Sequence, residues 1–376
     1  MIIKNASVFT NDCCFLDKDI FIEGQKLSDA TTDPSVLDGS GCYLIPGLMD
    51  IHFHGCVGYD FCDASIESLL QMAEYELKKG ITSICPASMT LDKDTLLSIC
   101  ENAVNYADAA SVTQGARLCG FNLEGPFISP DKRGAQNPAY ITTPDIGMMN
   151  ELLSVSKGLA KLITIAPETE GALPFIKEFA DVIRISIGHT SCDYETAKAA
   201  FLAGAKHMTH LYNAMPPLHH RHPGPIAAGM ENTSVTAEII CDGIHVAPAA
   251  VRAAFALFGK ERMIFISDSM MAAGMPDGEY TLGGLRVHVT GKLATLDDGT
   301  IAGSATNLMD CMRNAINTMQ IPLETAVRCC TINPAKAIGE DKEYGSIKTG
   351  KFADLVLLEK DTLAIRHVIL HGKVVS

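Results

Sequence analysis

Residues 46–55 read PGLMDIHFHG, an apolar run of strand length that ends in two histidines two positions apart. Side chains two apart on a strand share a face, so His52 and His54 can point to the same side of this strand's end. By itself the pair is a weak signal, because ordinary polar residues also occur at this spacing. Whether the pair forms a site depends on the residues at the ends of the other strands.

Apolar segments of strand length recur along the chain, each followed by a polar cluster and, in most cases, a stretch able to form a helix. Near-continuous apolar character is typical of parallel strands covered on both faces, and alternation with helices predicts a parallel sheet. The eight segments are 44–54, 83–87, 118–124, 162–166, 182–189, 207–213, 235–241 and 263–268. Helices are expected, for example, at 65–79, 95–107, 194–203 and 248–259. Eight such units predict an α/β protein with a (β/α)8 TIM-like barrel. A doubly wound sheet is the structural alternative, but it does not bring polar clusters together from so many strand ends.

Both ends of the chain have a different pattern, with short strand-like runs separated by turn residues. We therefore expect a small β-sandwich domain built from both termini. Its first part is 1–43, and its second part comprises 275–300 and 343–376. The barrel is expected to span 44–274, with final helices at about 304–340.

Composition excludes several classes of protein. With 47% hydrophobic and 20% charged residues, the 376-residue chain can bury enough apolar surface to fold into a compact globular protein. The formal charge of −14, from 44 acidic and 30 basic residues, gives no general attraction for nucleic acid or an anionic membrane. Any anionic ligand would need a local cluster of positive groups.

The 13 cysteines are scattered and have no CxxC spacing, which argues against a disulfide framework and a zinc knuckle. We expect them to be reduced core residues. No secretory signal is visible at the start of the sequence, and no apolar run reaches the length of a membrane span. A cytoplasmic location is therefore expected.

Metal-ligating residue types stand at the ends of five of the eight predicted strands. They are His52, His54, Glu124, His189, His210 and Asp268. Each has an ordinary alternative role, such as a turn residue or a helix cap. A barrel, however, brings the carboxyl ends of all its strands around one site. Together these nitrogen and oxygen ligands predict a site for one or two divalent transition metals. His288, His367 and His371, in the predicted β domain, are expected at the surface.

Six segments, in this order, resemble the amidohydrolase superfamily and, within it, the N-acetylglucosamine-6-phosphate deacetylases. They are PGLMDIHFHG (46–55), FNLEGPF (121–127), IGHT (187–190), THLYNAMPP (209–217), CDGIH (241–245) and ISDSM (266–270). GSIKTGKFADL (345–355) is also typical of the superfamily. The resemblance implies a metal-dependent hydrolase with this barrel and a flanking β-sandwich. The fourth predicted strand ends without the lysine that bridges two metals in many relatives, which weighs against a dihydroorotase or a hydantoinase.

The resemblance also implies roles for individual residues. Glu124, His189 and His210 should hold a first metal, and His52 and His54 leave room for a second. Zinc is the expected ion, with iron, manganese or cobalt as alternatives. Asp268 should deprotonate water and pass the proton to the leaving amine, and His245 should polarise the acetyl carbonyl. Further substrate contacts are expected at Ala135, Gln136, Asn213, Ala214, Asp242, Gly243, Ile244, Ile301, Ala302 and Gly303. Gln136 departs from the histidine that the family often has there.

A phosphate on the substrate needs a charge partner, and Arg221 in LHHRHPG (218–224) can supply it, because a guanidinium grips phosphate through two parallel hydrogen bonds. The alternative is an exposed loop or an adventitious metal tract. In the family this arginine reaches the site of a neighbouring subunit, so the resemblance implies at least a homodimer.

The predicted reaction is metal-dependent hydrolysis of the acetamide of N-acetylglucosamine 6-phosphate to glucosamine 6-phosphate and acetate. Three alternatives stay open. One is the same chemistry on N-acetylgalactosamine 6-phosphate. Another is a different amidohydrolase, such as an aminoacylase or a deaminase. The third is a barrel that binds ligands but has lost catalysis.

Overall fold

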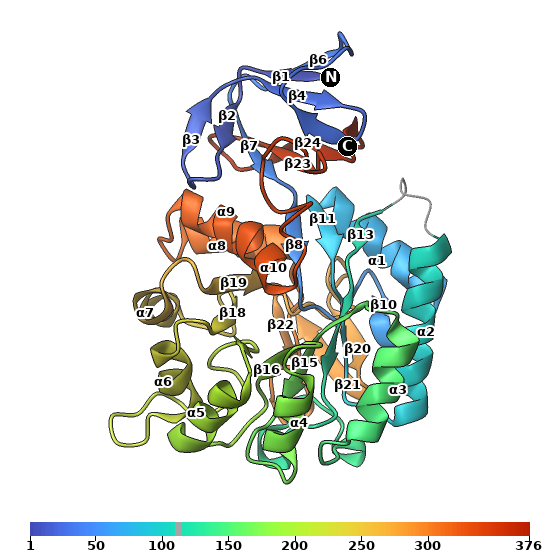
Figure 1. Ribbon diagram of the computed structural model, residues 1–376, viewed down its shortest axis with the longest axis vertical. Coiled ribbons are helices and arrows are strands. Elements are labelled where there is room, and N and C mark those ends of the chain that lie inside the picture. Colours follow the sequence, from blue (N-terminus) through green and yellow to red (C-terminus); the bar gives the residue numbers. More distant parts are fainter. Residues whose placement is uncertain (110–114) are drawn as a thin grey trace.

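The computed structural model describes residues 1–109 and 115–376. Its centre is a set of parallel strands that curl into a barrel (Figure 1). These strands are β8 (Leu48–Asp50), β11 (Ile81–Ile84), β12 (Ala87–Ser88), β13 (Arg117–Leu118), β14 (Phe121–Glu124), β15 (Ala160–Ile165), β16 (Arg184–Ile187), β17 (His207–Met208), β18 (Thr236–Ile240) and β19 (Met263–Ile266). They hydrogen-bond in the orders β13-β11-β8 and β12-β14-β15-β16-β17-β18-β19.

The eight predicted barrel segments are all present. β11 and β12 are two parts of the second segment, and β13 and β14 are two parts of the third. The amide of Asp268, just beyond β19, donates to the carbonyl oxygen of His52, just beyond β8, over 2.9 Å. The first and last segments therefore meet at the carboxyl end of the barrel. The predicted (β/α)8 TIM-like fold is confirmed.

The sixth segment is shorter than its predicted range of 207–213. β17 ends at Met208, and the backbone then turns through left-handed conformations, with φ of 27° at His210 and 79° at Tyr212. A strand cannot continue through such torsions. The apolar residues beyond β17 therefore form a tight turn that brings His210 back over the barrel mouth.

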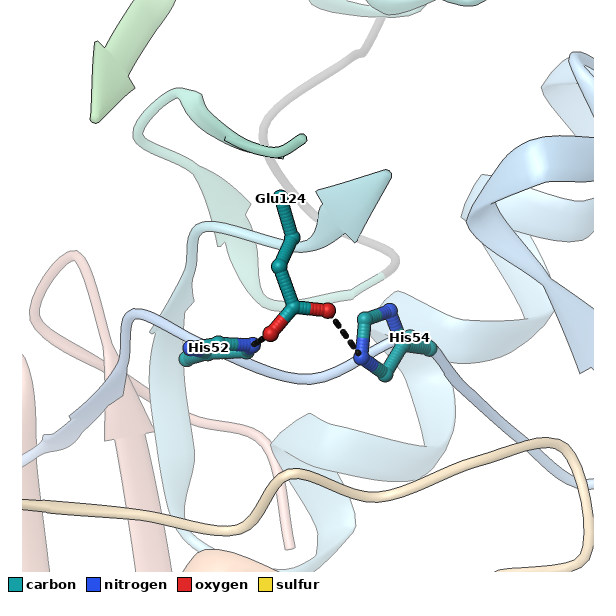
Figure 2. Close-up of side chains that lie close together, drawn as sticks. All are labelled: His52, His54 and Glu124. Carbon is teal, nitrogen blue, oxygen red and sulfur yellow. Dashed lines mark ion pairs between the residues drawn. The ribbon is translucent and has the colours of Figure 1, made fainter. Parts of the chain in front are cut away.

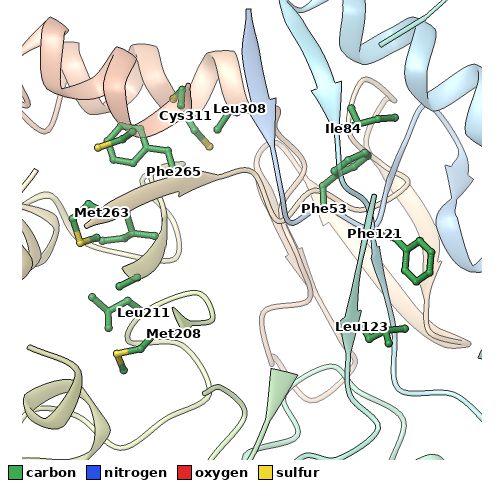
Figure 3. Close-up of a cluster of buried hydrophobic side chains, with 14 of the residues drawn as sticks. Phe53, Ile84, Phe121, Leu123, Met208, Leu211, Met263, Phe265, Leu308 and Cys311 are labelled. Carbon is green, nitrogen blue, oxygen red and sulfur yellow. The ribbon is translucent and has the colours of Figure 1, made fainter. Parts of the chain in front are cut away.

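Helices cover the outside of the barrel. They are α1 (Ile66–Lys78), α2 (Lys93–Ala109), α3 (Ile146–Ser156), α4 (Ala172–Phe179), α5 (Tyr194–Ala203), α6 (Gly224–Glu231), α7 (Pro248–Phe258), α8 (Leu308–Asn317), α9 (Leu323–Cys330) and α10 (Ile332–Ala337). Polar caps set several starts: the side chain of Ser65 accepts from the amide of Ser68 at the start of α1. Between β19 and α8, Phe265, Leu308 and Cys311 belong to one buried cluster (Figure 3). This packing holds the barrel strands, and so their ends, in place.

Both termini form two sheets that lie at one end of the barrel (Figure 1). The four-stranded sheet contains β1 (Ile2–Lys4), β4 (Ile20–Glu23), β5 (Lys26–Ser28) and β6 (Val36–Asp38). The six-stranded sheet contains β2 (Ser7–Phe9), β3 (Phe15–Asp17), β7 (Cys42–Pro46), β23 (Leu355–Glu359), β24 (Ile365–Leu370) and β25 (Lys373–Val374). Ile3, Ile22, Leu44 and Leu357 share one apolar core between the sheets. Since β7 runs through Gly47 directly into β8, this sandwich lies at the amino end of the barrel strands.

The segment 275–300 differs from its expected place in the sandwich. Its strands β20 (Gly278–Leu282), β21 (Leu285–Thr290) and β22 (Leu293–Thr295) form a separate three-stranded sheet that pairs with none of the described terminal strands. Leu282, Val287 and Val289 instead pack in a core with Met270 and Ala302. The physical reason is connectivity: the chain leaves β19 at the carboxyl end of the barrel, opposite the sandwich, and this sheet folds where the chain emerges.

The remaining elements are the hairpin β9 (Gly55–Cys56) and β10 (Tyr59–Asp60) and the short 3-10 helices Phe61–Asp63, Pro130–Lys132 and Pro138–Tyr140. Within residues 1–109 and 115–376, no helix combines the length and apolar character needed to cross a membrane.

Two expectations about single residues need correction. His371 is buried rather than at the surface, because its ring packs 5.0 Å from that of Phe352. Cys14 is exposed and Cys13 and Cys62 are half-buried, whereas the other ten cysteines are in the core as expected.

Candidate metal centre

Six side chains converge at the carboxyl end of the barrel. Glu124 is the last residue of β14, His52 and His54 follow β8, and His189, His210 and Asp268 follow β16, β17 and β19. The last three have left-handed backbones, with φ of 44°, 27° and 49°. Such torsions are uncommon for residues with a side chain and concentrate at functional sites. Here they turn each side chain from the end of its strand toward the barrel axis.

Glu124 lies between the two histidines of the first strand (Figure 2). Its Oε1 is 3.2 Å from Nε2 of His52, and its Oε2 is 3.4 Å from Nε2 of His54. All three side chains are buried. Their ligand atoms are close enough to one another to hold a single ion.

The same carboxylate belongs to a second group. Oε1 of Glu124 is 3.2 Å from Nε2 of His189 and 3.0 Å from Nε2 of His210, and these two nitrogens are 3.0 Å apart. This group can also hold one ion. Glu124 is therefore shared by two pairs of histidines, an arrangement suited to bridging two cations.

In three of the histidines, the ring nitrogen that faces away from the centre makes a hydrogen bond. This bond decides which nitrogen faces the centre. Nδ1 of His54 donates to the carbonyl of Ala87 over 3.1 Å, and Nδ1 of His189 donates to that of Lys132 over 2.9 Å. Nδ1 of His52 lies 2.9 Å from the carboxylate of Glu238. A neutral imidazole that donates from Nδ1 presents the lone pair of Nε2, as a metal ligand must.

The donor set fits a divalent transition metal. Nε2 of His52 is buried and has no hydrogen-bond partner among the described residues, although Glu124 Oε1 is nearby. A nitrogen lone pair facing a carboxylate oxygen is repulsive, so this position suits a cation: a metal ion when one is bound, or else a proton. Burial disfavours the protonated ring, but the carboxylates of Glu238 and Glu124 outweigh this effect and raise the pKa of His52. Imidazole and carboxylate are the ligand types that zinc and related ions take. The residues therefore fit metal binding, as the sequence predicted.

Asp268 lies beside His52 and His54 and also faces the cavity over this centre. Its Oδ1 is 3.3 Å from Nε2 of His54 and 3.8 Å from Nε2 of His52. Burial opposes ionisation, but the hydrogen bond with His54 and the nearby imidazoles outweigh it and hold the pKa of Asp268 below its ordinary value. Burial also opposes the ionisation of Glu124, yet the charges of His52 and His189 hold its pKa well below the ordinary value. Both acids are therefore carboxylates at neutral pH.

A cavity of about 360 Å³ opens over this centre. Of the predicted substrate residues, those in its wall are Ala135, Gln136, Asn213, Ala214, His245, Ile301 and Gly303. The wall also contains His54, Glu124, His189, His210 and Asp268, so ligand and metal positions share one space. His52 lies behind them, fully buried.

His245 is held in a fixed orientation. Its Nδ1 is 2.7 Å from Oδ2 of Asp242, whose Oδ1 accepts from the backbone amides of Ile244 and His245. Burial disfavours the imidazolium, but the bond to Asp242 outweighs this and raises the pKa of His245. Asp242 and Gly243 shape this turn without lining the cavity, and Ile244 is exposed beside it.

Gln136 lines the cavity but is also bonded to other protein groups, whereas Ala302 and Arg221 are not in the cavity wall. Nε2 of Gln136 donates to Oε2 of Glu124 over 2.5 Å, and its Oε1 accepts from the amide of Thr90 over 2.7 Å. Both ends of its amide are therefore engaged by protein groups. Ala302 is buried in the core under β20 to β22. Arg221 lies on an exposed loop and is not in the cavity wall of its own chain.

Glu238 and His207 were not among the residues predicted from the sequence. Glu238 is fully buried in the middle of β18 and faces both His52 and His207. The signal was present: a single acid interrupts the apolar segment 235–241. A buried acid needs partners, and in a barrel strand those partners lie on neighbouring strands.

Comparison with known proteins accounts for this arrangement. The amidohydrolase family matches residues 43–375. The chain belongs to the amidohydrolase family. An N-acetylglucosamine-6-phosphate deacetylase of Bacillus subtilis is 35% identical over 370 residues, which cover 96% of this chain and 93% of the relative. An N-acetylgalactosamine-6-phosphate deacetylase of Escherichia coli O157:H7 is 33% identical, covering 91% and 90%.

A solved structure of a relative has the same overall fold. The N-acetyl-D-glucosamine-6-phosphate deacetylase of Mycobacterium smegmatis, as an aspartate-to-alanine mutant in complex with N-acetyl-D-glucosamine-6-phosphate, superimposes with a TM-score of 0.92 at 32% identity. The match covers 100% of this chain and 98% of that chain. The resemblance found in the sequence is thus confirmed over nearly the whole length.

Proposed function

We propose that this amidohydrolase hydrolyses the acetamide of N-acetylglucosamine 6-phosphate to glucosamine 6-phosphate and acetate. The observation that carries the proposal is Glu124, shared by two histidine pairs at the floor of a cavity that Asp268 and His245 also line. The full-length similarity to deacetylases of this substrate supports the choice of reaction.

The metal is proposed to be held by Glu124, His189 and His210, with His52 and His54 available for a second ion. Zinc suits these ligands best, and iron, manganese and cobalt also accept them. When bound, a divalent ion supplies Lewis acidity, which polarises the acetyl carbonyl and makes a water molecule easier to deprotonate.

Asp268 is proposed as the group that moves the proton. Its buried carboxylate is ionised and lines the cavity, so it can accept a proton from the attacking water. The tetrahedral intermediate then collapses, the C–N bond breaks, and Asp268 returns the proton to the departing nitrogen. The proton that remains on the new carboxyl group also passes to the amine, so the products are acetate and the ammonium form of the amino sugar, and atoms and charge balance.

His245 is proposed to orient the acetamide. Because Asp242 engages its Nδ1, the other ring nitrogen is directed to the cavity, where it can donate to the substrate carbonyl or a sugar hydroxyl. Asn213 and Ala214 are proposed to contact the phosphosugar, and Ile301 to Gly303 to close over it. Gln136 donates to Glu124 and also lines the cavity, where it is proposed to contact the sugar.

Arg221 is proposed to bind the phosphate of substrate in the site of a neighbouring subunit. Its exposure and its absence from the cavity of its own chain support this assignment. A homodimer is then the smallest assembly with complete sites. The free state of all 13 cysteines supports the proposal of a reducing, cytoplasmic compartment.

The galactosamine epimer is a second candidate substrate, favoured by the similarity to the E. coli N-acetylgalactosamine-6-phosphate deacetylase. Acetate release from both epimeric phosphosugars, measured with zinc, iron, manganese or cobalt supplied, tests the proposal. We expect release from the gluco epimer with the higher kcat/KM. If neither epimer releases acetate with any of the four metals, the proposed deacetylase function is contradicted.

A further inference from the structure

Glu238 is a buried acid with an unusual set of partners. It lies in β18, fully shielded from solvent. Its Oε2 accepts from Nδ1 of His52 over 2.9 Å and from the amide of His210 over 3.2 Å. Its Oε1 accepts from Nε2 of His207 over 3.0 Å. Both oxygens are therefore engaged, on one side by residues of the candidate metal centre.

We propose that Glu238 is a positioning residue that fixes the tautomer and the direction of the His52 ring toward the metal. The inference rests on the proposed function, since it assigns His52 to metal binding. An ionised carboxylate only accepts hydrogen bonds, so Nδ1 of His52 must carry the hydrogen. Nε2 is then the nitrogen available to a metal, and it points toward Glu124, 3.2 Å away.

The group that accepts the Nδ1 hydrogen bond of His52 differs from the acceptors of His54 and His189. His54 and His189 donate from Nδ1 to neutral backbone carbonyls, whereas His52 donates to a carboxylate. A carboxylate partner increases the basicity of the imidazole more than a carbonyl does, so it strengthens the ring as a ligand. The effect of Glu238 should therefore concentrate on the group formed by His52, His54 and Glu124.

His207 holds Glu238 from the other side. It donates from Nε2 to Glu238, which leaves Nδ1 to accept from the hydroxyl of Thr236, 2.5 Å away. A line of hydrogen bonds thus runs from Thr236 through His207 and Glu238 to His52. Because every side chain of this line except Thr236 is fully buried, the carboxylate has little freedom to move away from His52.

The test is zinc titration of the full-length protein with a chelating competitor, comparing wild type with E238L and E238Q. Leucine removes the acceptor. We expect the wild type to bind two ions and E238L to bind one of them roughly 10- to 100-fold more weakly. The ion held by Glu124, His189 and His210 should keep its affinity. Glutamine keeps a neutral acceptor near His52, so E238Q should weaken the same ion severalfold, less than E238L.

Thr236→Val is the matched control, because it cuts the line at its far end and leaves the bonds of Glu238 intact. Its zinc affinities should equal those of the wild type. A second readout is the tautomer of His52 from ring ¹⁵N chemical shifts in the metal-free protein, recorded above the pKa of His52, which Glu238 and Glu124 raise against the effect of burial, so that the ring is neutral. The wild type and E238Q should show the Nδ1–H form, and E238L should show a mixture of the two tautomers.

Several results would overturn the proposal. They are a wild type that binds a single ion, E238L with both affinities unchanged, or E238L that loses both ions together. If E238L does not fold, E238Q decides: a loss confined to one ion supports the proposal, and equal binding of both ions refutes it. None of these measurements needs substrate, so failure of acetate release by the wild type refutes the proposed reaction without touching this result.

Discussion

At the scale of single residues, the centre depends on charged side chains that are largely shielded from solvent. Glu124 and Asp268 are both buried, and each stays ionised because imidazole groups surround it. Neither forms an ion pair with a lysine or arginine of the described residues. The neighbouring histidines, and a metal when bound, therefore provide the compensating charge that a buried carboxylate requires.

Asp268→Asn tests the proton transfer. Asparagine keeps the size of the side chain, but it cannot take a proton from water. We expect kcat for acetate release to fall roughly 10²- to 10⁴-fold, with metal content unchanged. Metal analysis of the purified variant is the control. Turnover close to that of the wild type, with metal retained, would show that Asp268 does not carry the proton.

Another buried acid, Asp354, lies away from the metal centre. Its Oδ1 accepts from the amide of His371 over 2.7 Å, whereas its Oδ2 has no hydrogen-bond partner among the described residues and lies 3.9 Å from Nε2 of His371. Burial raises its pKa from 3.8 to about 6, against the opposing effects of the His371 amide and Arg117. The folded protein therefore binds this proton more tightly than the unfolded chain. Its stabilising effect is full below pH 4 and is lost as the pH rises through 6.

Asp354→Asn should remove this dependence, because the amide cannot ionise and its oxygen can still accept from His371. We expect the free energy of unfolding of the variant, relative to the wild type, to increase by up to about 3 kcal/mol between pH 4 and pH 7. Denaturant unfolding of both proteins across this range measures the difference. A difference that is constant with pH would contradict a raised pKa at Asp354.

At the scale of elements, the site depends on how closely neighbouring strands approach. Gly188 follows β16 and precedes His189. A Cβ at this position would lie 2.6 Å from Cβ of Thr209 and 3.0 Å from Cγ2 of Thr164. These contacts come from the segments on either side, whose threonine hydroxyls hydrogen-bond to each other over 2.8 Å. Only glycine allows β16 to sit between them and hold His189 beside His210.

Gly188→Ala should therefore both destabilise the fold and disturb the centre. We expect a loss of about 1–3 kcal/mol in unfolding free energy from overpacking, together with weaker zinc binding by the group of Glu124, His189 and His210. Gly147→Ala, in the first turn of α3, is the control and should change stability by less than about 1 kcal/mol. Unaltered zinc affinity in Gly188→Ala would show that the strand spacing does not set the position of His189.

At the scale of the whole molecule, the two ends of the barrel have different tasks. The sandwich of both termini covers the amino end, whereas the metal centre and the sheet β20 to β22 lie at the carboxyl end. The cavity of a single chain lacks a positive side chain from the loop of Arg221. The proposal that Arg221 binds the substrate phosphate in the site of a second chain can be tested by mixing subunits.

Two inactive variants should restore activity when they share a dimer. Arg221→Ala alone should lose activity on phosphorylated substrate but not on an unphosphorylated analogue, and Asp268→Asn should lose both. In a mixed dimer, the site with Asp268 receives Arg221 from its partner. Random association of the two variants should then recover about a quarter of wild-type activity. Co-expression with two tags and an acetate assay measure this, and no recovery would mean that Arg221 does not act across the interface.

Much of the fold and of the candidate site could be predicted from one sequence, because a barrel brings the carboxyl ends of all its strands around one site. Residues that follow successive strands, such as His52, Glu124 and Asp268, must meet at one end. Gln136 was harder: its alignment with a family position indicated a sugar contact, but nothing in the sequence showed that its amide also bonds to Glu124 and Thr90. The segment 275–300 was misplaced because its alternating pattern shows that strands form but not which sheet they join.

The sequence by itself determined the fold class, the family and the set of candidate metal-ligating residues, because hydrophobic periodicity and strand-end motifs are local properties of the chain. Only the tertiary structure revealed that Glu124 is shared by two histidine groups, that Glu238 and His207 support His52, and that β20 to β22 form their own sheet. These features are pairings between distant segments, and which hydrogen-bond partner a buried group finds depends on how strands pack across the barrel.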